Sequence, residues 1–209
     1  MLSTKAISPL LALAICASPC FASEPTEIPF NSSQIIRETI GQVNNSGSNS
    51  MQFGYAARVS GIDNAFSTNA ATDQNESTAR FTFYTEVVNL RVTTNGPLTI
   101  IVREGTTTLY LNSSPASFGS PDSFRSGTPI QTSVIHQQVI VDTFEKTFTV
   151  VNSNTITSTE RFWLDGTEYE LGDVGQIFKT RLVGVLTVRD GSTPPPTGYF
   201  SGYSEGVKK

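Results

Sequence analysis

Short runs in which apolar and polar residues alternate recur along most of the chain, and this alternation constrains its fold more than any other feature. Residues 51–59 are the clearest example, because Phe53, Tyr55 and Val59 fall on one face of an extended strand. Successive side chains of a β-strand point to opposite faces, so a period of two predicts strands with one buried face. Turn residues separate the runs. The chain is therefore expected to be all-β.

One segment departs from this pattern. In residues 31–43, Ile36, Ile40 and Val43 have helical spacing after a capping residue. This spacing permits one short helix within an N-terminal lead-in of residues 23–50.

The composition fits a sheet with solvent-exposed faces. Thr (27 residues) and Ser (24 residues) are abundant, and Thr is favoured at exposed strand positions. The net charge of −4 excludes a basic nucleic-acid-binding surface as the main function. Frequent turns and no internal repeat predict one domain over residues 51–209, built as an antiparallel β-sandwich or a closed β-barrel. Strand periodicity fits both architectures equally.

Two hairpins are expected. Glu104 and Gly105 separate two apolar runs, and a two-residue turn there sets apolar residues opposite each other. Asp165 and Gly166 form the second turn, since Asp-Gly is a strong hairpin signal.

The long loop of residues 112–128 carries two aromatic side chains. Phe118 and Phe124 predict that this loop folds back over the sheet, because large apolar side chains seek burial.

Residues 1–22 have the layout of a cleaved secretory signal peptide. A positive charge at Lys5 precedes an apolar run, and small residues stand at Cys20 and Ala22 before the expected cleavage site. The run is too short to span a bilayer, so no transmembrane span is expected in the mature chain.

Cys16 and Cys20 are the only cysteines, so the mature chain is expected to lack disulfides and thiolate metal sites. The predicted location is secreted or periplasmic. The length also fits an outer-membrane barrel, but no pair of aromatic girdles is visible in the sequence.

Four aromatic residues with polar tips are the candidate ligand-binding residues. Trp163, Tyr169, Tyr199 and Tyr203 would make a platform for sugar rings or a protein partner if they were exposed on a flat sheet. The alternative is ordinary packing in a core.

Acidic residues near the second hairpin are the candidate metal ligands. Asp165, Glu168 and Asp173 supply oxygen atoms of the kind that hold Ca²⁺, and no other cofactor is expected. Such carboxylates would also serve as the acid–base pair of a glycoside hydrolase. Against both, Asp165 has a role in the turn, and the spaced Asp-x-Asp-x-Asp-Gly loop is absent.

No catalytic residue is assigned. His136 is the only histidine, and it falls in the middle of an expected strand. Ser204 lies within a Gly-x-Ser-x-Gly match, but a nucleophile elbow needs a helix after the serine, and only five residues follow it.

These features predict an exported, non-catalytic β-domain with a binding or structural role at the cell exterior or in the periplasm. Its partner would be a protein or a glycan. The first alternative is a barrel that carries a small apolar ligand, and a large apolar cavity would distinguish it. The second alternative is a carboxylate-based hydrolase, which requires two carboxylates converging in a cleft.

Overall fold

The computed structural model describes residues 24–28, 34–187 and 197–206, and the expected signal peptide lies outside these ranges. Within them, no helix has the length and apolar character needed to cross a bilayer. The described residues form eleven strands and two short 3-10 helices: β1 (Thr26–Ile28), β2 (Ile35–Ser46), β3 (Asn49–Val59), η1 (Ala71–Asp73), β4 (Phe81–Asn95), β5 (Leu98–Leu111), η2 (Pro121–Arg125), β6 (Thr128–Asp142), β7 (Thr147–Thr159), β8 (Phe162–Leu164), β9 (Thr167–Leu171), β10 (Ile177–Thr187) and β11 (Thr197–Gly206).

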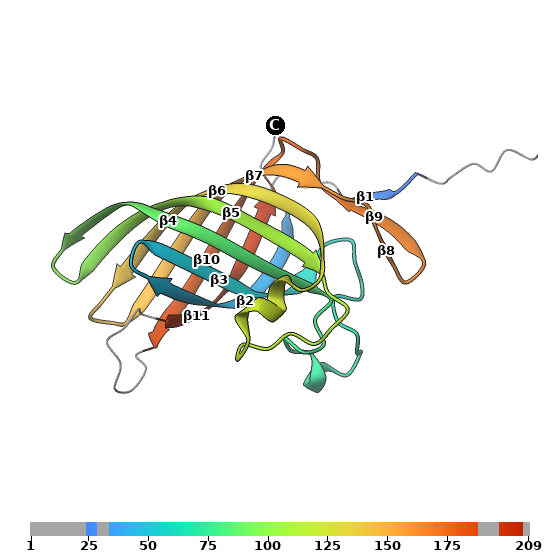
Figure 1. Cartoon of the computed structure of the whole chain (residues 1–209), viewed down its shortest axis with the longest axis horizontal. Helices are drawn as coiled ribbons and strands as arrows, with labels where there is room; N and C mark the ends of the chain where they lie inside the picture. The colour runs from blue at the N-terminus through green and yellow to red at the C-terminus, as the bar shows by residue number, and fades with distance from the viewer. Residues whose placement is uncertain (1–23, 29–33, 188–196, 207–209) are drawn as a thin grey trace, which may run out of the picture.

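Eight of these strands close into an antiparallel barrel, in the order β10-β11-β2-β3-β4-β5-β6-β7 (Figure 1). The remaining strands form a small sheet in the order β1-β9-β8. The pairing of β11 with β2 joins the first and last strands of the barrel wall, with Tyr199 opposite Gln42. The all-β expectation is confirmed, and of the two architectures the chain adopts the barrel. Closure leaves the barrel wall without an unpaired edge.

Strand β2 occupies the segment for which the sequence permits a short helix. Ile36 and Val43 are both buried, but they belong to two separate cores. Residues seven apart share one face of a helix and lie on opposite faces of a regular strand. The helical spacing therefore reflects burial on both faces of one strand. Hydrogen bonding of β2 to β3 and β11 outweighs a weak local helix preference.

The hairpin expected at Glu104 and Gly105 is wrong. β5 runs unbroken through both residues and pairs with β4 and β6. A Cβ atom at Gly105 would lie 2.0 Å from the carbonyl oxygen of Glu86, so this glycine permits close approach of two strands. The turn between β4 and β5 lies at Gly96, whose φ is +59°.

The hairpin expected at Asp165 and Gly166 is confirmed. Both residues have positive φ, at 50° and 85°, as a tight two-residue turn requires. Phe162 of β8 pairs with Tyr169 of β9, and their rings stack with centroids 5.8 Å apart.

The loop of residues 112–127 packs against the outer face of β3, as its phenylalanines predict. Phe124 is fully buried, and its ring centroid lies 5.4 Å from that of Phe53 and 5.0 Å from that of Phe118. The buried side chains of residues 60–80 join the same core.

These loops and the small sheet lie toward one end of the barrel, and the β4–β5 hairpin lies at the other end (Figure 1). Phe162 of the small sheet meets Phe81 of β4 edge to face, with centroids 5.9 Å apart. Apolar side chains fill this end of the barrel. Within the lumen, a cavity lies toward the opposite end.

Candidate ligand-binding cavity

The middle of the barrel lumen is lined by polar side chains. On the described strands, the buried lumen-facing polar residues include Thr39, Ser50, Gln52, Thr85, Arg103, Ser133, Gln137, Asn152, Asn154, Thr180 and Ser204. Apolar residues at alternating positions of the same strands, such as Val134, Val151 and Val183, point outward and are exposed. Alternation therefore identifies the strands correctly, but it does not identify which face is enclosed.

A cavity of about 190 Å³ lies within the lumen, toward the end that carries the β2–β3 turn. Its rim includes Gly47 of that turn, which is exposed, and Asn45 and Asn89, which are half-buried, so the cavity reaches solvent at this end. Most of its wall is apolar, and this part consists of Val43, Ile101, Val139, Val141, Phe148, Val150, Leu186 and Phe200. Such a lining favours a ligand with an apolar body.

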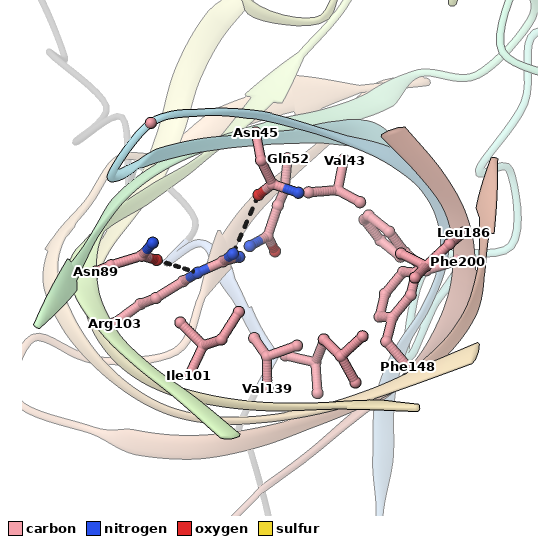
Figure 2. Close-up of a pocket in the computed structure, with 13 residues that line it drawn as sticks. Val43, Asn45, Gln52, Asn89, Ile101, Arg103, Val139, Phe148, Leu186 and Phe200 are labelled. Carbon is pink, nitrogen blue, oxygen red and sulfur yellow. Dashed lines mark hydrogen bonds between the residues drawn. The ribbon is translucent and has the colours of Figure 1, made fainter. Parts of the chain in front are cut away.

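Arg103 is the charged residue of this cavity. It extends from β5 into the lumen, opposite the side where Phe148, Phe200 and Leu186 gather (Figure 2). The residue is only 5% exposed. Burial lowers the pKa of the Arg103 guanidinium to about 10, so it remains protonated at neutral pH.

Four neutral side chains hold the Arg103 guanidinium. Nε donates to Asn89 Oδ1 at 2.7 Å, and Nη2 donates to Asn45 Oδ1 at 3.1 Å. Nη1 donates to Ser50 Oγ at 3.0 Å and to Gln137 Oε1 at 3.4 Å. These partners come from β2, β3, β4 and β6, and they fix the direction of the side chain.

Two glutamines form the inner floor beside Arg103. Gln52 and Gln137 exchange hydrogen bonds, and Gln137 Nε2 also donates to Asn152 Oδ1 at 3.0 Å. This network crosses the lumen from β3 to β7. It lies between the larger cavity and a smaller one of about 40 Å³ that Gln52 also lines.

The smaller cavity is lined by a second arginine, Arg37, which is half-buried overall but whose Nε is fully buried. Burial lowers the pKa of Arg37 to about 10, and its Nε has no hydrogen-bond partner. The guanidinium carbon lies 5.5 Å from the ring centroid of Phe178, within the range of a cation–π contact. Among the salt bridges of the described residues, none involves Arg37 or Arg103.

The four candidate aromatic residues do not share one surface. Trp163 is 62% exposed and pairs with Glu168, whereas Tyr169 pairs with Phe162, so the two aromatics lie on opposite faces of the β8–β9 hairpin. Tyr199 and Tyr203 lie on the outer wall of the barrel, on β11. The structure therefore does not assemble them into one platform.

The candidate metal ligands are likewise not brought together. Asp165 accepts hydrogen bonds from Arg80 at 2.7 Å and Asn64 at 3.0 Å. Within the described ranges, no three His, Cys, Asp or Glu residues are grouped so that they could hold a metal ion. This finding covers Glu168 and Asp173 as well as Asp165.

His136 and Ser204 lie apart, His136 on the outer wall and Ser204 beside the smaller lumen cavity. His136 is on the outer wall, where its Nδ1 lies 2.9 Å from Glu104 Oε1. Ser204 is buried within β11, and its hydroxyl lies 2.8 Å from that of Thr180. Since Ser204 lies inside a strand, it is not at a nucleophile elbow.

The face of β5 that lines the cavity is not identifiable from this strand alone. Ile101 and Arg103 share that face, whereas Leu98 and Ile100, at the alternating positions, point outward and are exposed. Only the closure of the barrel places Arg103 in an enclosed lumen. Comparison of the chain with protein-family models, curated proteins and solved structures gave no match.

Proposed function

We propose that the protein is an exported, non-catalytic β-barrel that binds a small, largely apolar ligand in its lumen. The observation that carries the proposal is the cavity of about 190 Å³, walled mainly by apolar side chains and reaching solvent at one end of the barrel. Binding would remove apolar ligand surface from water, which contributes roughly 25 cal/mol per Å² buried.

The cavity size limits the ligand. A cavity of about 150 Å³ lined by apolar side chains can hold benzene. The lumen cavity is somewhat larger. We therefore expect a ligand of about six to eight carbon atoms rather than a long acyl chain.

The proposed location is the cell exterior or the periplasm. It rests on residues 1–22, whose order of positive charge, apolar run and small residues is that of a secretory signal peptide. The lack of cysteine after residue 22 fits export without disulfide formation.

Binding to purified protein tests the proposal. A panel of six-carbon ligands (an acid, an alcohol and an amine) would be titrated by isothermal calorimetry. We expect at least one to bind with one-to-one stoichiometry. Val139→Phe should abolish binding because Val139 points into the cavity. Ile140→Phe adds a ring on the outer face of the same strand and should leave binding unchanged.

Two outcomes would contradict the proposal. The first is that no member of the panel binds the unaltered protein at millimolar concentration. The second is that Val139→Phe, folded as judged by circular dichroism, binds as well as Ile140→Phe.

A further inference from the structure

Among the described residues that line the two lumen cavities, the charged side chains are both positive. Arg103 and Arg37 each face one of the two lumen cavities, and neither set of described lining residues contains Asp or Glu. A buried charge is costly unless an opposite charge or strong hydrogen bonds compensate it. Because both charges have the same sign, the lumen attracts anions.

The hydrogen bonds of Arg103 position its charge but do not neutralise it. A guanidinium has five N–H groups, and the bonds to Asn89, Ser50, Gln137 and Asn45 use four of them. The remaining hydrogen is on Nη2. All four acceptors are neutral, so an incoming anion would supply both an acceptor and the missing charge.

The rest of the cavity specifies the other part of the ligand. Phe148, Phe200 and Leu186 gather on the side of the lumen opposite Arg103 (Figure 2). A ligand that fills the cavity must therefore present an apolar surface on one side and a polar group on the other. This division matches a small organic acid.

We propose that the lumen ligand is a small monocarboxylate and that Arg103 binds its carboxylate inside the barrel, an inference that rests on the proposed function. The carboxylate accepts a hydrogen bond from Nη2, and the apolar body packs against the aromatic wall. Arg37 adds to the positive potential from the smaller cavity, but it does not line the larger one.

The affinities of hexanoate and 1-hexanol for the full exported chain test the inference, since the two differ only in the head group. A hydrogen bond to a charged group is worth about 1.5–3 kcal/mol, so hexanoate should bind about ten- to a hundredfold more tightly than hexanol. Arg103→Gln should reduce this ratio to about one, because it removes the charge.

Arg37→Gln is the matched control, because it removes the other arginine that lines a lumen cavity. This variant should keep most of the preference for hexanoate. In the unaltered protein, the NMR signal of the Arg103 Nε–H should shift with hexanoate more than with hexanol. This last measurement does not depend on the folding of any variant.

The results that would overturn the carboxylate inference differ from those that would overturn the proposed function. Equal affinities of the unaltered protein for hexanoate and hexanol would overturn the carboxylate inference and leave lumen binding intact. A preference for hexanoate that persists in folded Arg103→Gln, or an unchanged Arg103 signal, would also overturn it. If neither compound binds and no other member of the panel does, the proposed function itself fails.

Discussion

Gln52 and Gln137 face each other across the lumen and exchange two hydrogen bonds, with nitrogen–oxygen distances of 2.9 and 3.2 Å. Both are buried, so replacing either one with leucine removes both hydrogen bonds of the pair. Gln137→Leu also leaves the buried amide of Gln52 without this partner, whereas Gln52→Leu leaves Gln137 bonded to Arg103 and Asn152. We expect each single substitution to cost about 1–3 kcal/mol of unfolding free energy in urea titrations. The double substitution should cost less than the sum of the two.

The control for this cycle is Gln138→Leu, which alters an exposed glutamine on the same strand. Its effect should stay within about 0.5 kcal/mol. Strict additivity of the Gln52 and Gln137 substitutions would contradict a direct interaction between the two side chains.

The affinity for hexanoate should be highest between about pH 6 and pH 9 and should fall on either side of this range. Below about pH 5 the ligand becomes protonated and loses its charge, so the affinity for hexanoate falls. Burial lowers the pKa of Arg103 to about 10, so the affinity falls again as the pH rises through that value. Between about pH 6 and pH 9 it should be constant. The affinity for hexanol, measured in parallel, should not follow this profile.

The turn of the β8–β9 hairpin should show an altered titration. Hydrogen bonds from Arg80 and then Asn64 hold the pKa of Asp165 below its usual value. Its contribution to stability is therefore present above the unfolded-state pKa of the carboxyl and is lost as the pH falls through the folded-state value. Arg80→Gln should raise the pKa of Asp165, as followed by NMR of the carboxyl carbon.

Arg161→Gln is the control for that titration. Arg161 lies next to β8 and pairs with Glu170 at 3.5 Å, away from the Asp165 carboxyl. It should leave the titration of Asp165 unchanged. If Arg80→Gln also leaves it unchanged, the assigned cause of the shift is wrong.

Substitution of Gly105 tests whether β5 continues through this position in close contact with β4. A Cβ atom there would lie 2.0 Å from the carbonyl oxygen of Glu86, so Gly105→Ala should destabilise the protein by about 1–3 kcal/mol in urea. At Gly119 the nearest atom to an added Cβ is the Ser117 hydroxyl at 3.5 Å. Gly119→Ala should therefore cost less than about 0.5 kcal/mol. Equal stabilities of the two variants would contradict the close strand contact.

Phe124 should anchor the loop of residues 112–127. It is fully buried between Phe53 and Phe118, so Phe124→Ala should cost about 3–5 kcal/mol of unfolding free energy. Phe144 is 80% exposed, and Phe144→Ala should change stability by less than about 0.5 kcal/mol. Similar losses for both variants would argue against anchoring by Phe124.

The two Gly-containing turn signals show how far local sequence predicts this fold. Asp165 and Gly166 adopt the positive φ values that their residue types favour, so local chemistry and fold agree. Glu104 and Gly105 have a similar local signal, but β5 continues through them because both neighbouring strands pair with it. A glycine that permits close strand approach resembles a turn glycine when only one strand is considered.

The cavity was less predictable than the fold. Strand alternation separates two faces, but only the closure of eight strands decides which face is enclosed. Arg103 and Gln137 are far apart in sequence, and their contact depends on the pairing of β5 with β6. The sequence therefore offered an exposed aromatic platform and, as an alternative, a barrel with an apolar cavity, but it did not identify which residues line the lumen.

The pairing of β2 with β11 also has a kinetic consequence. Non-local strand pairs form slowly, because a long chain segment must be ordered before they contribute any stability. The wall closes only when residues 197–206 meet the strand at residues 35–46. Until then, the polar lumen is open to water and two strand edges are free to pair with other chains. The cavity wall includes Phe200 of β11, so a nascent chain that still lacks β11 has no complete cavity.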